Sequence, residues 1–361
     1  MEARIKQAFD KDGSYGLFAL FVTGVLRQSI RGWTSTRLEA GGKKPLTESE
    51  LNAYLGLEIA MSICPLNDIA DYWSGERFLG QPGFIETMAC DRFQQIRSAL
   101  QFHAPMPVTF ATVRDPLYCC RGLLHHFQKR FAETAVPLGT SSLDEISVRT
   151  KARSRARTYM PSKPDKYGLR FYAVVRWGSL YVHSLWDNGS GNVTRSTPAE
   201  RYTQVFPSLR TPLYNTLSRP EVNIDPKSAT ALWIAMAGHQ TRTFRSPSGR
   251  RLLVSDNFYT RHTYAPAVEA FTDGEVRLLG TVRMNLVDRF NKFALEPVIK
   301  RIAVQERGEW ELVAAVVPES DYKKNAAAHD KKQKKRPKHL QTEYMPTLTY
   351  AEHAGYIVFK D

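Results

Sequence analysis

Two aspartates, each near the end of a short apolar stretch, are the residues best suited to chemistry. Asp144 lies in the segment 142–145 (SLDE), and Asp256 lies in the segment 254–257 (VSDN). If the two strands are neighbours, both carboxylates can meet at one edge of a sheet. Carboxylate oxygens bind Mg²⁺ or Mn²⁺, and such ions activate a water or 3′-hydroxyl for attack on a phosphodiester. A lone aspartate after a strand is more often a turn or capping residue, so spacing alone leaves both interpretations open.

Basic residues alternate with other residues directly after the first acidic segment. In an extended segment, alternate side chains lie on one face, where they could contact DNA phosphates. A solvated basic edge strand is equally compatible with the pattern. The residues predicted to contact DNA are Arg149, Lys151, Arg153, Arg155, Arg157, Lys163, Lys166 and, further along the chain, Arg283.

Composition limits the class of protein. The chain has 361 residues, of which 42% are hydrophobic, enough for a sizeable core. Its formal net charge of +14 favours polyanions, nucleic acid before an anionic membrane. The longest apolar run, 15–26, is too short to span a bilayer, so no membrane partner is predicted. None of the four cysteines forms a CxxC pair, which argues against a zinc or redox motif and for a reducing compartment. We expect a cytosolic or nuclear location and favour the nucleus.

The elements that must position the two aspartates follow from hydrophobic patterning. Residues 1–135 are predicted to be a mostly helical region, with a capping box at Thr47 and Glu50. Residues 136–361 are predicted to be a mixed α/β core. The predicted strands of this core are 142–148, 169–177, 179–185, 251–254 and 276–282, and its helices are 198–205, 228–238 and 264–271.

The stretch 286–345 shows no clear periodicity. It contains a polar run, 323–339, with eight lysines or arginines. This run is either a solvated mobile segment, a phosphate contact or a nuclear import signal.

The chain resembles the PiggyBac-type transposases and the PiggyBac transposable element-derived proteins in four ordered blocks. The first runs from Thr47 to Leu57 and continues with Asp71-Tyr72-Trp73, Asp91-Arg92-Phe93 and Leu100-Gln101-Phe102-His103. The second is Leu143-Asp144-Glu145 with Tyr159-Met160-Pro161, Lys163-Pro164 and Gly168. The third is Ser255 to Thr260 with Gly280 to Asn285, and the fourth is Tyr350, Gly355 and Asp361.

The resemblance implies an RNase H-like mixed sheet, the DDE/D transposase core, behind a helical N-terminal region. It also implies an insertion before the last catalytic helix, which corresponds to about 286–345. The implied activity is DNA transposition with Mg²⁺ (or Mn²⁺), acting on transposon ends and TTAA target sites, by a homodimer. Asp144 matches the first catalytic aspartate of the family and Asp256 matches the second.

The third catalytic position departs from the family pattern. Val358 stands where the catalytic aspartate is expected, and only Asp361 matches, at a later position. The resemblance therefore assigns the metal to Asp144, Asp256 and Asp361, in a core that stops inside its third motif. We expect DNA binding with impaired strand cleavage. The alternatives are an active enzyme completed by another carboxylate, such as Glu309 or Glu311, or by another chain, and a non-catalytic DNA-binding or protein-interaction protein derived from a transposon.

Overall fold

The computed structural model describes residues 2–76, 79–105, 115–135, 139–161, 163–187, 204–218, 251–260 and 264–361. Its contacts divide the chain into two compact units, Met1–Gly280 and Thr281–Asp361, each of which is described by itself. The helix predicted at 228–238 and most of the one predicted at 198–205 lie outside the described residues. Within the described residues, no helix is both long and apolar enough to cross a membrane.

The first unit begins with helices. They are α1 (Glu2–Phe21), α2 (Gly24–Ala40), α3 (Glu48–Ile63), η1 (Ala70–Trp73), α4 (Pro82–Thr87), α5 (Cys90–Ala99) and α7 (Tyr118–Thr134). The predicted capping box at the start of α3 is present, because the Thr47 hydroxyl accepts from the Glu50 N–H and the Glu50 carboxylate accepts from the Thr47 N–H. Arg92 of α5 donates to the same carboxylate at 2.8 Å and so ties α5 to the start of α3.

The helices α2 to α5 share an apolar core of their own. Leu51, Phe93 and Ile96 are completely buried in it. Trp73 packs against this cluster, and its indole N–H donates to the Met88 carbonyl oxygen at 2.7 Å. Trp73 and Phe93 are therefore core residues of the helical region.

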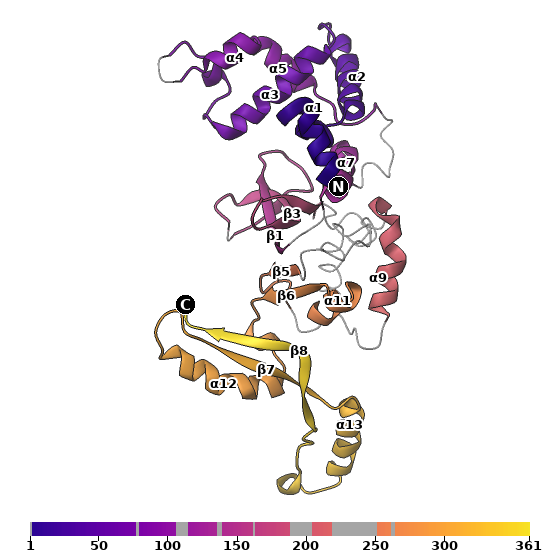
Figure 1. Cartoon of the computed structure of the whole chain (residues 1–361), viewed down its shortest axis with the longest axis vertical. Coiled ribbons are helices and arrows are strands. Elements are labelled where there is room, and N and C mark those ends of the chain that lie inside the picture. Colours follow the sequence, from indigo (N-terminus) through magenta and orange to yellow (C-terminus); the bar gives the residue numbers. More distant parts are fainter. Residues whose placement is uncertain are drawn as a thin grey trace. The chain divides into compact units, whose positions relative to one another are not determined.

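A six-stranded mixed sheet follows the helices (Figure 1). Its strands are β1 (Thr140–Arg149), β2 (Thr158–Tyr159), β3 (Tyr167–Arg176), β4 (Val182–Asp187), β5 (Arg251–Ser255) and β6 (Val276–Gly280). β3 pairs antiparallel with β1, β2 and β4, whereas β5 pairs parallel with both β1 and β6. The spatial order β3-β1-β5-β6 places the strand that carries Asp144 next to the strand that precedes Asp256.

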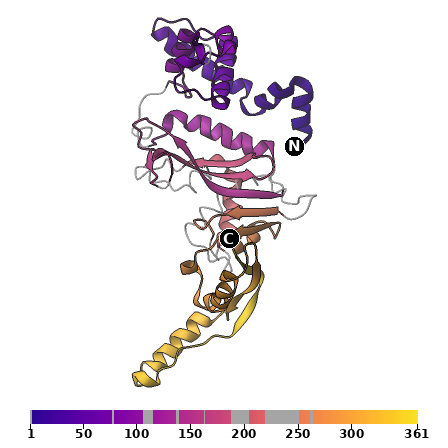
Figure 2. The ribbon, with the colours of Figure 1, turned by 90° about the vertical axis from the view of Figure 1, so that its left-hand side faces the viewer.

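Helices cover the sheet. α7 runs along the strands (Figure 2), and its Gln128 side chain donates to the Leu185 carbonyl of β4 at 2.8 Å. The core of the sheet contains Leu143, Trp186 and Leu253 together with buried residues of α9 (Arg210–Leu217) and α11 (Tyr264–Phe271). The predicted mixed α/β class is thus confirmed.

The second unit is built on a long hairpin. β7 (Trp310–Pro318) and β8 (Leu348–Phe359) pair antiparallel, and α12 (Arg289–Ala303) packs against both strands (Figure 1). Between the strands lie α13 (Tyr322–Gln333) and η6 (Lys338–Leu340), and η5 (Met284–Leu286) precedes α12. The stretch 286–345, for which the sequence predicts less regular structure, contains two α-helices and a strand. The domain boundary at residue 135 and the insertion before a last catalytic helix stay predictions.

Candidate active site

The two predicted catalytic aspartates lie where the parallel pairing of β1 with β5 ends. The last pair of this pairing is Leu143 and Ser255, and each is followed directly by its aspartate, Asp144 within β1 and Asp256 just after β5. Leu143 and Ser255 are buried, whereas Asp144 and Asp256 are exposed. Because side chains alternate along a strand, the pairing brings both carboxylates to one edge of the sheet.

A backbone N–H of a nearby residue orients each carboxylate, one position further along the chain for Asp144 and two positions further for Asp256. Asp144 Oδ1 accepts from the Glu145 N–H at 2.7 Å, and Asp256 Oδ1 accepts from the Phe258 N–H at 2.9 Å. Neither carboxylate forms an ion pair with any residue that the structure describes. Both therefore keep oxygen lone pairs for another ligand.

A buried hydroxyl pair fixes the turn after β5. The Ser255 and Thr260 hydroxyls lie 2.6 Å apart, and the Thr260 hydroxyl also donates to the Asp256 carbonyl at 2.7 Å. Gly280 of β6 lies against this pair, and a Cβ at that position would come within 2.0 Å of Thr260 Oγ1 and 2.7 Å of the Ser255 carbonyl oxygen. Only glycine fits here without moving the turn that carries Asp256.

Tyr259 lies beneath the acidic edge. Its side chain is 4% exposed, and its ring meets that of Tyr172 edge-on with the centroids 6.1 Å apart. Burial raises the pKa of the Tyr259 hydroxyl far above its usual value, and the nearby negative charges of Glu145, Asp144 and Asp256 raise it further. The two aspartates therefore act electrostatically on one buried group, which agrees with their pairing by strand register. Glu145 itself is paired with Arg170, 3.3 Å away.

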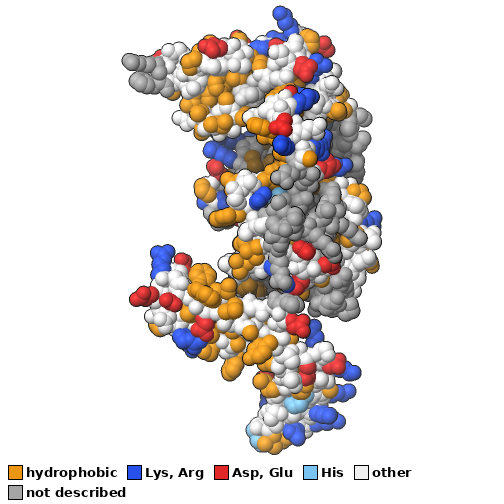
Figure 3. Space-filling model, in the orientation of Figure 1, with side chains coloured by type: hydrophobic (Ala, Val, Ile, Leu, Met, Phe, Trp, Pro, Cys, Tyr) orange, Lys and Arg blue, Asp and Glu red, His pale blue; other side chains and the backbone are white. Residues whose placement is uncertain are grey.

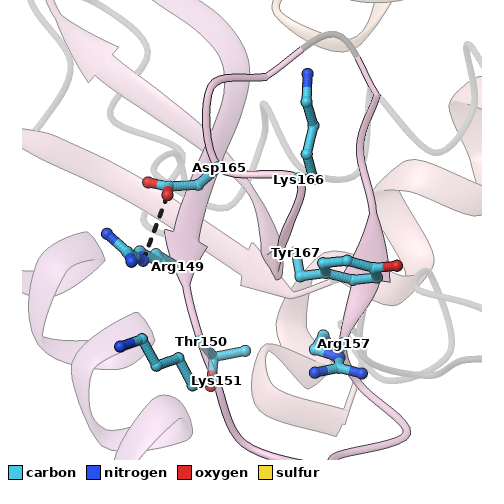
Figure 4. A pocket seen from close by; sticks show the side chains of 7 residues that line it. All are labelled: Arg149, Thr150, Lys151, Arg157, Asp165, Lys166 and Tyr167. Atoms are coloured by element: carbon cyan, nitrogen blue, oxygen red, sulfur yellow. Dashed lines mark ion pairs between the residues drawn. The ribbon is translucent and has the colours of Figure 1, made fainter.

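A basic pocket of about 400 Å³ lies where β1 ends and β3 begins (Figure 4). It is lined by Arg149, Thr150, Lys151, Arg157, Asp165, Lys166 and Tyr167. Asp165 pairs with Arg149 at 3.3 Å, and the Arg157 guanidinium lies over the Tyr167 ring at 4.8 Å from its centroid. Four of the seven lining side chains are cationic, which suits a phosphate group.

The remaining predicted DNA-contacting residues do not line this pocket. Arg153 and Arg155 are exposed in the loop between β1 and β2, and the Lys163 N–H donates to the Met160 carbonyl in the next turn. Arg283 is exposed in the second unit. Sequence reasoning missed Thr150, Asp165 and Tyr167 of the pocket, although each is adjacent in the chain to a basic residue that it selected.

The predicted extended segment after β1 is a loop. Thr150 Oγ1 accepts from the Ala152 N–H and Ser154 Oγ accepts from the Ala156 N–H, both at 3.1 Å. Hydroxyl groups that bond to nearby backbone compete with strand pairing. The expectation that five alternating basic residues share one strand face is therefore wrong, and the turn brings Arg157 back to the pocket that holds Arg149.

The third predicted metal ligand belongs to the other unit. Asp361 is exposed there, with a carboxylate oxygen 3.7 Å from Arg307, and Val358 lies in β8 opposite Glu311. No group of three or more His, Cys, Asp or Glu side chains able to hold a metal ion occurs in the described part of the chain. Asp144 and Asp256 still fit Mg²⁺, since this ion is commonly held by one or two carboxylates with waters and substrate phosphates.

Comparisons with known proteins agree with this geometry. Residues 14–186 match the family model described as Transposase IS4, a stretch that includes Asp144 but not Asp256. A cryo-EM structure of the piggyBac transposase synaptic complex with hairpin DNA matches with a TM-score of 0.59 at 18% identity. The match covers 82% of this chain and 55% of that one, so the chain spans little more than half of its length. A search of curated proteins gave no match. The predicted RNase H-like fold and the predicted resemblance are thus confirmed.

Proposed function

We propose, from the transposase domain in residues 14–186, that this chain is a PiggyBac-like, transposase-derived DNA-binding protein. The acidic edge of its sheet would support metal-dependent cleavage and transfer of DNA strands. The observation that carries the proposal is the side-by-side placement of Asp144 and Asp256 by the pairing of β1 with β5. Its substrates are transposon ends and TTAA target sites, with a homodimer as the acting form and the nucleus as its location.

Different residues of the first unit would have different roles in this function. Asp144 and Asp256 would hold a Mg²⁺ or Mn²⁺ ion, which when bound supplies charge to activate a nucleophile and stabilise the leaving oxygen. Arg149, Lys151 and Lys166 would bind backbone phosphates in the basic pocket and fix the strand's register. The buried Tyr259 and the hydrogen-bonded hydroxyls of Ser255 and Thr260 would hold the turn that carries Asp256 in place.

Cleavage is expected to be weak. The position that matches the family's third catalytic aspartate is Val358, whose side chain cannot bind a metal, and it lies in a strand rather than a helix. This same observation favours a second candidate function, a DNA-binding protein without catalysis. In that case Asp144 and Asp256 bind no metal for chemistry and are only part of the folded structure.

A strand-cleavage assay separates the two candidates. Duplex DNA with a TTAA end is incubated with the full chain and Mg²⁺ or Mn²⁺. In the first case Asp144→Asn and Asp256→Asn each lower cleavage at least about a hundredfold, since an acidic metal site supplies several kcal/mol to the transition state. Glu86→Gln, an exposed carboxylate of α4, is the matched control and leaves cleavage unchanged. Cleavage that persists in both aspartate variants contradicts the proposed site, and DNA binding with no cleavage supports the second candidate.

A further inference from the structure

The helix α13 has two chemically distinct faces. Tyr322, Ala326, His329 and Gln333 recur at spacings of three and four, and all are buried or half-buried. This spacing places them on one side of the helix. The side chain of Gln333 accepts from the Thr342 N–H at 3.3 Å, and the rings of Tyr322 and His329 lie 6.1 and 5.7 Å from that of Tyr344. This face of α13 therefore packs against the segment that contains Thr342 and Tyr344.

The opposite face of α13 is lined with lysines. The exposed side chains of α13 are Asn325, Asp330 and six others, Lys323, Lys324, Ala327, Ala328, Lys331 and Lys332, and we call these six residues the lysine face. The two lysine pairs are eight residues apart, or about 12 Å along the helix axis. Because the two alanines between them are short, a flat or convex surface can approach the helix closely there. Figure 3 shows the basic side chains gathered over α13.

Positively charged residues continue after the C-terminal end of α13. Lys334, Lys335, Arg336 and Lys338 are all exposed, and the acidic residues in the stretch 321–338 are Asp321 and Asp330. None of these eight cations forms an ion pair with a residue that the structure describes. The stretch therefore presents a net positive charge that the described part of the second unit does not neutralise.

The positions of the first two lysines are unfavourable for the helix itself, whereas Lys331 and Lys332 lie in its last turn, where the helix dipole favours positive charge. Lys323 and Lys324 lie in the first turn of α13, where the helix dipole disfavours positive charge. A helix of 12 residues is marginal without packing, so these charges cost stability that the aromatic contacts must offset. A polyanion bound to the lysine face would remove this cost. A membrane surface fits less well, since the face offers alanine rather than large apolar side chains between its charges.

The segment 319–347 connects β7 to β8 and carries α13, and we call it the arm. Hydrogen bonds join its two ends, next to the hairpin. The Glu319 N–H donates to the Thr347 carbonyl at 3.0 Å, and the Glu319 carboxylate accepts from the Asn325 amide at 3.0 Å and from the Tyr344 hydroxyl. These bonds lower the pKa of Glu319, the Tyr344 hydroxyl contributing most. The lysine face is thereby presented on an anchored support rather than on a free tail.

We propose that the lysine face of α13 binds the phosphate backbone of duplex DNA and is a DNA-docking surface in addition to the acidic edge and the basic pocket. The identity of the polyanion rests on the proposed function, whereas the location of the surface rests on α13 alone. Binding there is independent of DNA sequence, because phosphate contacts carry no base information.

The test compares charge removal at two places in the full-length chain. One variant changes Lys323, Lys324, Lys331 and Lys332 to Gln. The matched control changes four other exposed lysines, Lys6, Lys43, Lys44 and Lys300, to Gln, which gives the same net charge. A third variant changes the four lysine-face residues to Arg, which preserves charge. Affinity for a fluorescent duplex lacking TTAA is measured over a range of salt concentrations.

The lysine-face variant is expected to lose more than tenfold in affinity at low salt. The slope of log Kd against log salt should fall by about 3 to 4, since each phosphate contact contributes about 0.9. The Arg variant and the matched control should each keep the slope within about one. Equal losses in the lysine-face variant and the matched control overturn the inference, as does a loss seen with anionic vesicles but not with DNA. If the unsubstituted chain binds no DNA, the proposed function fails as well. If it binds and the two charge-removal variants behave alike, only the inference about α13 fails.

Discussion

The acidic edge of the sheet and the lysine face of α13 reach their chemistry by different means. At the acidic edge, two carboxylates are placed by backbone pairing between β1 and β5 and by a turn in which Gly280 leaves no room for a larger residue. On α13, four lysines are placed by helical spacing and are free to move at the ends of long side chains. The first arrangement depends on position and the second on charge, so the two should respond differently to substitutions that keep the charge.

The largest effect is expected from Asp144→Glu, which keeps the charge and moves the carboxylate by one methylene. A displacement of about 1 Å can cost about a hundredfold in rate. We therefore expect strand cleavage to fall at least about a hundredfold and Mn²⁺ affinity by calorimetry to fall with it, while DNA binding is unchanged. A variant that keeps both cleavage and metal affinity within tenfold of the original would show that position is not what the acidic edge requires.

The second prediction concerns the stability of the sheet at low pH, which depends on a buried histidine. His183 of β4 is 1% exposed, and burial lowers its pKa to about 4. The unfolded chain takes up that proton below about pH 6.5, so the contribution to stability is complete above pH 6.5 and about 3 kcal/mol is lost as the pH falls to 4.

Chemical denaturation between pH 4 and 7 measures this effect. His183→Gln should flatten the dependence, whereas His339→Gln, an exposed residue of η6, should leave it as it is. If both variants keep the original slope, protonation of His183 does not govern the acid stability of the sheet.

A smaller loss is expected from Gly280→Ala. The added Cβ would meet the Ser255 carbonyl and the Thr260 hydroxyl, and such overpacking costs about 2 kcal/mol. Because Asp256 follows Ser255, metal affinity should also fall. Gly178→Ala is the matched control, since nothing lies within 4 Å of its Cβ, and its free energy of unfolding should change by less than about 1 kcal/mol. Equal stabilities of the two variants would mean that the turn adjusts at no cost.

The smallest effect is expected from Lys331→Arg with Lys332→Arg. Phosphate attraction depends mainly on charge, so DNA affinity should change by no more than about twofold. Titration of the double variant with the fluorescent duplex measures it. A loss of tenfold or more would show that the lysine face, like the acidic edge, recognises its ligand by shape.

The sequence predicted the elements of the acidic edge better than their support. The apolar stretches before Asp144 and Asp256 were predicted to be strands, and they are β1 and β5. Their pairing had to be assumed, because a parallel contact between residues about a hundred positions apart leaves no local pattern. The steric role of Gly280 also depends on the register of β5 against β6, which side-chain alternation alone does not specify.

For the basic residues, the sequence pattern was identified correctly but the backbone structure predicted from it was wrong. Their alternation after Asp144 was real, but a pattern of charges does not report the competing bonds of the Thr150 and Ser154 hydroxyls that turn the chain. In α13, the half-buried positions at spacings of three and four were visible in the sequence. They were obscured by the number of lysines, which suggested a solvated run rather than an amphipathic helix.

The hydrogen bond between Glu319 and Thr347 has a consequence for how such a chain can change over evolutionary time. Because it closes the excursion between β7 and β8 at its base, residues added or removed near the exposed turn at 334–341 alter the length of the arm and leave the hairpin intact. Doubling a flexible loop costs only about 0.6 kcal/mol. The arm is therefore a module that can be exchanged, and replacing it would change the surface that we propose binds DNA while the hairpin of β7 and β8 stays the same.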